Sequence, residues 1–129
     1  MKFKTFLPAL CLILPSFLYA NQQTEQVQEY LNETNKRSKF ISTYMNASKS
    51  YREKREYTIQ EQKDYMCNLR LLYSDLIHYQ TPYLHLEIFP EVQTVNRQIE
   101  DNYHALDRSI KKLQIACSEG IINVPINNF

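Results

Sequence analysis

The stretch that decides the fold is residues 90–117, PEVQTVNRQIEDNYHALDRSIKKLQIAC. Its apolar residues recur every three or four positions, the spacing that places side chains on one face of an α-helix. They are Val92, Val95, Ile99, Tyr103, Leu106, Ile110, Leu113 and Cys117. Pro90 suits the first turn of such a helix, and Gly120 suits its left-handed C-terminal cap. We therefore predict one amphipathic helix over this stretch.

Two earlier stretches have the same periodicity. A first helix is predicted from about Thr24 to Ala47, with one apolar stripe opposite a face of Gln, Glu, Asn and Lys. A second begins after the capping-box pair Thr58 and Glu61. Its stripe contains Met66, Leu69, Leu72, Tyr73 and Leu76. Between the two, residues 48–57 are either a solvated helical extension or the connecting turn. Together the stretches predict an all-α fold, a small bundle of three amphipathic helices of the coiled-coil kind.

The first twenty residues have the order of a secretory signal peptide. A basic start precedes an uncharged, mostly apolar stretch at 5–18, and Ala20 precedes a polar stretch. The apolar stretch is shorter than the roughly 20 residues that a membrane helix needs. We therefore predict cleavage after Ala20 and no stable membrane insertion afterwards. The mature chain is then a single helical domain of residues 21–129, with a short apolar tail at 121–129.

Two cysteines, Cys67 and Cys117, remain after the predicted cleavage. An even number of cysteines behind a signal peptide indicates a disulfide formed in an oxidising compartment. We expect the bond to lie within one chain, with an intermolecular bridge as the alternative. The expected location is the periplasm, with the extracellular space as the alternative.

The disulfide also constrains how the second and third helices meet. If the second helix ended at Tyr79 and turned back at once, the two helical cysteines would lie on the order of 20 Å apart. Thr81-Pro82 instead favours a kinked helical continuation over residues 82–88, with the turn at Phe89-Pro90. In this register, His104 lies opposite residue 80.

Residues 83–88 have an alternative interpretation as a strand. Leu84, Leu86 and Ile88 alternate with more polar residues, which is strand periodicity. The apolar residues 121–126 would then pair with this strand. Otherwise the tail packs along the bundle or stays available to a partner.

Composition excludes several classes of function. A single Gly excludes the glycine-rich loops that cradle phosphates, and a net charge of +1 gives no electrostatic footprint for nucleic acid. No motif for a nucleophile is present, so we expect no enzymatic activity, no catalytic residue and no cofactor.

Two carboxylate–histidine pairs have the i, i+3 spacing found in helical metal sites. They are Asp75 with His78, and Asp101 with His104. Both histidines lie off the apolar stripes, so we interpret them as solvated surface residues and predict no metal site.

Tyrosine is conspicuous, with ten in the chain. Tyr79, Tyr83, His85 and Phe89 gather at the predicted kink, and exposed Tyr is enriched in protein interfaces. We therefore predict a partner-binding surface there, with local packing over the hairpin end as the alternative. The segment 52–56 is either a surface for anions or, because its charges alternate, a self-paired solvated stretch.

These features predict a small exported helical protein that acts by binding another protein. The expected role is an accessory or adaptor of an envelope or secretion machine. One alternative is a periplasmic inhibitor or immunity protein that neutralises an enzyme or toxin. The other is a self-associating structural or secreted effector protein, for example a homodimer.

Overall fold

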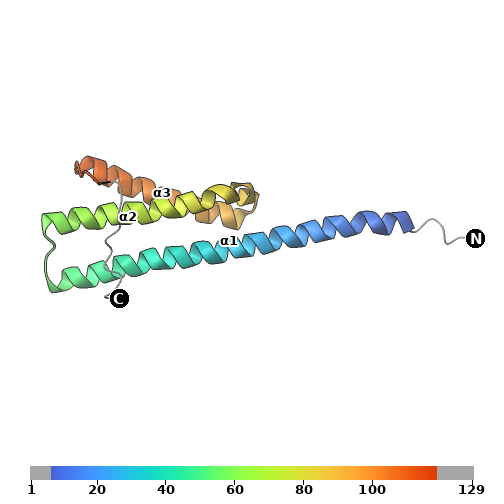
Figure 1. Ribbon diagram of the computed structural model, residues 1–129, viewed down its shortest axis with the longest axis horizontal. Coiled ribbons are helices and arrows are strands. Elements are labelled where there is room, and N and C mark those ends of the chain that lie inside the picture. The colour runs from blue at the N-terminus through green and yellow to red at the C-terminus, as the bar shows by residue number, and fades with distance from the viewer. Residues whose placement is uncertain (1–6, 119–129) are drawn as a thin grey trace, which may run out of the picture. The chain divides into compact units, whose positions relative to one another are not determined.

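The computed structural model describes residues 7–118, with side chains from residue 21 onward. Its elements are α1 (Leu7–Lys54), α2 (Ile59–Gln80), the 3-10 helix η1 (Thr81–Ile88) and α3 (Pro90–Lys112) (Figure 1). No strand occurs in this range, so the predicted all-α fold is confirmed. The chain divides between Glu33 and Thr34, inside α1, into two compact units.

In the first unit, α1 is continuous through Ala20. Val27 and Tyr30 are its buried apolar side chains between residues 21 and 33, and they have the predicted spacing. The helix starts well before Thr24, so the predicted start is wrong, and it continues past Ala47 into residues 48–54. Cleavage after Ala20 stays a prediction.

In the second unit, the part of α1 that starts at Thr34 is antiparallel to α2 (Figure 1). Residues 48–54 continue the helix and residues 55–58 form the turn, so each interpretation of 48–57 is correct for part of it. The Thr58 hydroxyl accepts from the Glu61 N–H at 3.2 Å, and the Glu61 carboxylate accepts from the Thr58 N–H at 2.9 Å. This confirms the predicted capping box, which satisfies two N–H groups that a helix start leaves unpaired.

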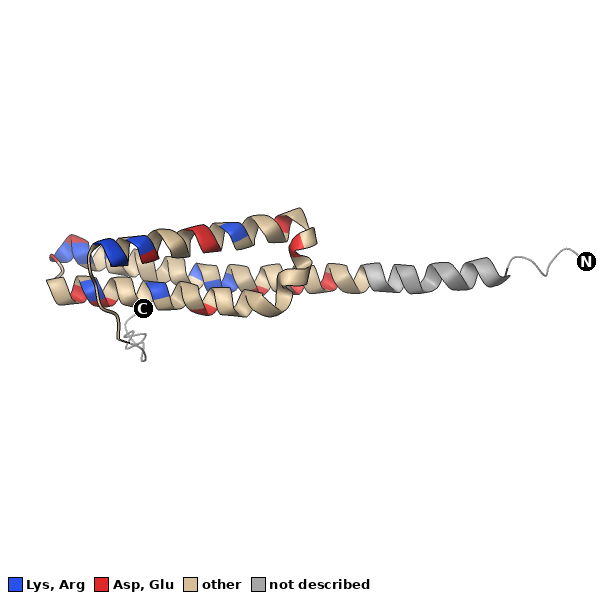
Figure 2. Cartoon of the chain, turned by 90° about the horizontal axis from the view of Figure 1, so that it is seen from above, with Lys and Arg blue, Asp and Glu red and all other residues tan. Residues whose placement is uncertain are grey.

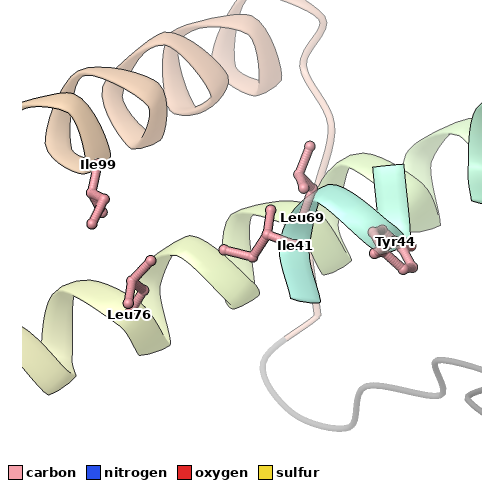
Figure 3. Packing of buried hydrophobic residues seen from close by; sticks show 5 residues of the cluster. All are labelled: Ile41, Tyr44, Leu69, Leu76 and Ile99. Carbon is pink, nitrogen blue, oxygen red and sulfur yellow. The ribbon is translucent and has the colours of Figure 1, made fainter. Parts of the chain in front are cut away.

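The core of the second unit contains side chains from all three α-helices. Its buried members are Ile41, Tyr44, Leu69, Leu76 and Ile99. Figure 3 shows Ile99 of α3 pointing toward α2, where Leu76 and Leu69 lie. Burying side chains of this size stabilises the fold by about 1.5–3 kcal/mol each, because apolar surface leaves water.

The predicted kink is present as the 3-10 helix η1, with Pro82 in its first turn. Three residues per turn place every third side chain on one face. Leu86 is buried and Tyr83 is half-buried on that face, whereas Leu84 and Ile88 are 50% and 73% exposed. The strand alternative is therefore wrong for this segment, because the period is three residues instead of two.

A buried polar network holds the bend between α2 and α3. The Gln80 amide donates to the Asn96 side-chain oxygen at 3.2 Å, and the Asn96 amide donates to the Glu87 carboxylate at 2.8 Å. Gln80 and Asn96 are 2% and 1% exposed. Phe89 has an extended backbone and precedes Pro90 at the start of α3, so the predicted position of the turn is confirmed.

The end of α3 differs from the prediction. The helix stops at Lys112, well before Gly120, and Leu113 is 58% exposed instead of lying on the buried stripe. Gln114 has a φ of 54°, its N–H donates to the Lys111 carbonyl, and the Ile115 N–H donates to the Ile110 carbonyl. This pattern is a Schellman motif, in which Gln114 takes the left-handed position that glycine usually occupies. Gly120 and the tail at 121–129 lie outside the described residues, as does the proposed pairing of 121–126.

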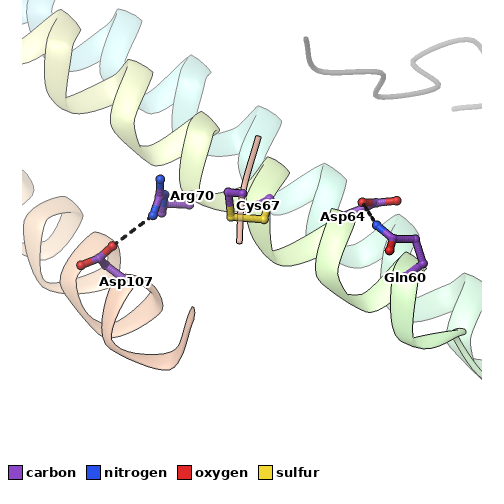
Figure 4. The surroundings of a disulfide bond; sticks show 6 residues. Gln60, Asp64, Cys67, Arg70 and Asp107 are labelled. Atoms are coloured by element: carbon purple, nitrogen blue, oxygen red, sulfur yellow. Dashed lines mark hydrogen bonds and ion pairs between the residues drawn. A yellow bond between two sulfur atoms is a disulfide. The ribbon is translucent and has the colours of Figure 1, made fainter. Parts of the chain in front are cut away.

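The disulfide joins Cys67 and Cys117 of one chain, with their Cα atoms 5.5 Å apart, as predicted. Cys117 nevertheless lies beyond α3, in the non-helical segment that the Schellman motif directs back toward α2 (Figure 4). The predicted register assumed two helical cysteines and is therefore wrong. Arg70 pairs with Asp107 at 3.4 Å, and this pair and the Gln80–Asn96 bond define the true register, in which His104 no longer faces residue 80.

Candidate functional site

The candidate metal ligands do not converge. His78 and His104 are exposed, and Asp75 forms an ion pair with Arg37 at 3.2 Å. No group of three or more potential metal ligands occurs among residues whose side chains are described. Within the same part of the chain, no helix has the length and hydropathy to cross a bilayer.

The structure brings together two of the four residues predicted to bind a partner. The ring centroids of Tyr79 and Tyr83 lie 5.3 Å apart. The Arg37 guanidinium carbon lies 4.3 Å from the Tyr79 centroid, and Tyr79 also packs against the core. Tyr79 is therefore largely a packing residue, and it fixes the position of the half-buried Tyr83 ring.

The other two predicted residues lie on different faces of η1. Phe89 is half-buried and follows the face that carries Leu86, whereas His85 is exposed and shares a face with Ile88. The sequence interpretation missed Leu84 and Ile88, which are the most exposed large apolar residues of η1. A three-residue period starting at Thr81-Pro82 is the signal that points to them.

We define the hairpin-end surface as the exposed part of η1, where Leu84 lies on one face, His85 and Ile88 lie on the adjoining face, and the half-buried Tyr83 borders them. Its charged neighbours along the chain are mostly acidic. Glu91, Glu100 and Asp101 are exposed on α3, with Arg97 as the exposed cation between them. The surface is therefore apolar, with mostly acidic charges beside it on α3, whereas on the α1 side Arg37 lies over the Tyr79 ring and pairs with Asp75.

A second cluster lies at the other end of α2, where tyrosines of α1, the turn and α2 stack in series. Ring-centroid distances are 5.6 Å for Tyr44–Tyr65, 6.3 Å for Tyr57–Tyr65 and 5.6 Å for Tyr51–Tyr57. The Tyr57 hydroxyl donates to the Ser48 carbonyl at 3.2 Å. Burial is the main cause that raises the pKa of Tyr44 and Tyr65, so these phenols stay neutral at physiological pH.

Two arginines attach to this tyrosine stack in different ways. Arg55 donates to the Tyr51 hydroxyl and to the Glu61 carboxylate, and these bonds raise its pKa. The Arg52 guanidinium carbon lies 5.7 Å and 5.5 Å from the centroids of Tyr57 and Tyr65. Arg52 forms no ion pair within the described residues. Residues 52–56 are exposed, as the solvated interpretation predicted, but the predicted self-pairing is wrong, because Arg55 pairs with Glu61 outside the segment and Arg52 lies over tyrosine rings.

Comparison with known proteins adds no identification, since no protein-family model, curated protein or solved structure matches this chain.

Proposed function

We propose that the protein is a small exported helical accessory or adaptor of an envelope machine and that it acts by binding another protein. The observation that carries this proposal is the hairpin-end surface. Leu84 and Ile88 are large aliphatic residues at 50% and 73% exposure, next to a Tyr83 ring that the Tyr79 stack holds in place. A few residues carry most of the binding energy at protein interfaces, with Tyr enriched among them, and neighbouring exposed apolar side chains such as these mark an interaction site.

The surroundings of the surface indicate the chemistry of the partner. Glu91, Glu100 and Asp101 leave a negative surplus over Arg97 on the neighbouring α3. A partner with complementary charges presents apolar side chains flanked by Lys or Arg. The network of buried Gln80 and Asn96 with half-buried Glu87 holds η1 against α3, which reduces the entropy lost on binding.

Export is supported by the signal-like first twenty residues and by the disulfide, since such bonds persist in oxidising compartments. A protein exported to the envelope meets the machines of that compartment, which favours an accessory or adaptor role at such a machine over a role inside the cell. The identity of the partner separates this role from that of an inhibitor or immunity protein.

The test is cross-linked capture of the tagged full-length chain from its own cell envelope, read by mass spectrometry. Ile88→Asp is compared with Ile59→Asp, since the two side chains are almost equally exposed, at 73% and 76%, while Ile59 starts α2 and Ile88 ends η1, which follows the other end of α2. We expect Ile88→Asp to reduce recovery of the dominant partner at least about tenfold, as a hot-spot residue does, with Ile59→Asp near wild type.

Equal recovery with both variants would contradict the hairpin-end surface as the binding site. Recovery of the bait alone would contradict an accessory role and support self-association. A circular dichroism melt of each variant checks that a lost partner does not reflect a lost fold.

A further inference from the structure

Large apolar side chains are exposed at the end of α2 opposite η1. Tyr51 near the end of α1 is 43% exposed, Ile59 at the start of α2 is 76% exposed, and Leu113 just past α3 is 58% exposed. The Arg70–Asp107 pair and the disulfide place the end of α3 beside the N-terminal half of α2 (Figure 1). We call these residues and the cations around them the loop-end surface.

Cations are in excess at this surface. Figure 2 shows blue segments at the ends of α1 and α3, with red segments beside them and further blue segments along the bundle. Those without an ion pair within the described residues are Lys49, Arg52, Lys54, Lys63, Arg108 and Lys112. The carboxylates there without an ion pair are only Glu53, Glu56 and Asp64, because Glu61 and Asp107 are already paired.

Helix dipoles explain part of this excess but do not cancel it. α1 and α3 both end here, and each C-terminus carries roughly half a negative charge, which favours Lys54 and Lys112 in the last turns. Two such ends amount to about one negative charge, less than the surplus of cations. The surface therefore stays positive.

We propose that the loop-end surface attaches the protein peripherally to an anionic lipid surface. A bilayer interface offers anionic headgroups and apolar chains together, which suits Ile59 and Leu113 among unpaired cations. Tyr51 suits the same interface, because its ring is apolar and its hydroxyl is polar. The cations come from three separate elements, and a lipid surface attracts them without requiring a matched arrangement of partner groups.

This inference does not depend on the proposed function, because it concerns the opposite end of α2. Each Lys or Arg near an anionic membrane contributes about 1 kcal/mol, or about fivefold in affinity. Since the contributions add, removal of two of the cations is expected to weaken binding about 25-fold.

The test is flotation of the protein, in the form purified from the producing cell, with phosphatidylcholine vesicles that contain or lack phosphatidylglycerol. The test variant is Lys54→Glu with Lys112→Glu, since neither side chain forms an ion pair in the described fold. The control, Lys39→Glu with Arg97→Glu, changes the net charge equally at exposed positions outside the loop-end surface. A further variant, Ile59→Ser, tests the apolar contribution against Ile88→Ser.

We expect flotation with phosphatidylglycerol at low salt, release at high salt, a loss of at least about 25-fold in the Lys54/Lys112 variant and little change in the control. Ile59→Ser should weaken flotation, whereas Ile88→Ser should not. No flotation at low salt, equal flotation with phosphatidylcholine alone, or equal loss in test and control variants would each overturn the proposal. Retention on immobilised polyglutamate without vesicle binding would overturn it as well, in favour of an acidic protein segment.

Discussion

Removing the Cys67–Cys117 bond should lower the free energy of unfolding. The size of the loss depends on whether the segment after α3 stays packed on α2 without the bond. The cysteines are 50 residues apart, and in the chain-entropy model closing such a loop in the unfolded chain is worth about 4 kcal/mol. That value holds only if the segment after α3 keeps its folded position against α2 when the bond is absent.

The structure favours release of that segment. Beyond the Schellman motif at Gln114, Ile115 and Cys117 are only half-buried, and Ala116 and Ser118 are exposed. Without the bond, the folded chain also gains conformational entropy, because a loop of about 5 residues opens. In the same model this gain stabilises the folded state by about 2 kcal/mol and offsets part of the gain in the unfolded state. The expected net loss is about 2 kcal/mol, half of the value from the unfolded state alone.

Urea unfolding followed by far-UV circular dichroism measures this difference between the wild type and Cys67→Ser with Cys117→Ser. The wild type with excess reductant is the matched control and should coincide with the double variant. A loss near 4 kcal/mol would show that the segment stays docked on α2, against our expectation of release. A loss below about 0.5 kcal/mol would refute the loop-closure reasoning altogether.

Other predictions concern the core, the polar network and the start of α2. Leu76→Ala should cost about 3 kcal/mol in urea unfolding, since Leu76 is 1% exposed, while Leu71→Ala at 40% exposure should cost under about 1 kcal/mol; equal losses would contradict the core assignment. Asn96→Leu leaves the buried Gln80 amide without its acceptor and should cost about 1–3 kcal/mol. A double-mutant cycle with Gln80→Leu should recover part of that loss, and strict additivity would argue against coupling. The hydrogen bond from the Thr58 backbone N–H is the main cause that lowers the pKa of Glu61 below its ordinary value of 4.5. The ionised carboxylate therefore stabilises the fold fully above pH 4.5, and this stabilisation is lost as the pH falls through the lowered pKa. Glu61→Gln should therefore flatten the acid limb of melting temperature against pH, and an unchanged limb would refute this.

Features of the fold that depend on neighbouring residues were predictable from the sequence. Helical stripes, the capping box at Thr58 and Glu61, and the turn at Phe89 each arise within one or two turns of chain. The disulfide partners were predictable because only two cysteines follow the signal-like segment. Such local signals need no knowledge of how the helices pack.

The sequence prediction placed the end of α3 too late, because a left-handed cap at a residue other than glycine is less easily recognised. A glycine at 120 suggested the cap, whereas the structure places the left-handed residue at Gln114. The apolar pair Ile110 and Ile115, spaced as the Schellman motif requires, is the local pattern that indicates this ending. The error then propagated into the register, since a helical Cys117 shifts every residue of α3 relative to α2.

The candidate surfaces were harder to predict than the fold, because exposure depends on tertiary packing. A strand period assigns Leu84, Leu86 and Ile88 to one face, but the 3-10 period buries only Leu86. Alternating charges at 52–56 suggested neighbours in sequence as partners. Arg55 instead pairs with Glu61 across the turn, and Arg52 stacks on tyrosines, which leaves its charge without a carboxylate partner there.

The two proposed surfaces should act independently, because α2 separates them. Its 22 residues span about 33 Å, so Ile88 beyond its end and Ile59 at its start cannot share one contact. Vesicle-bound protein should therefore still capture the partner identified by cross-linking, with an affinity within about twofold of that in solution, since uncoupled sites have no coupling free energy. Flotation of the partner with phosphatidylglycerol vesicles, with and without the protein, measures this. Competition between partner and vesicles would show that both ligands use one surface, and the Ile88→Asp and Ile59→Asp variants would identify which.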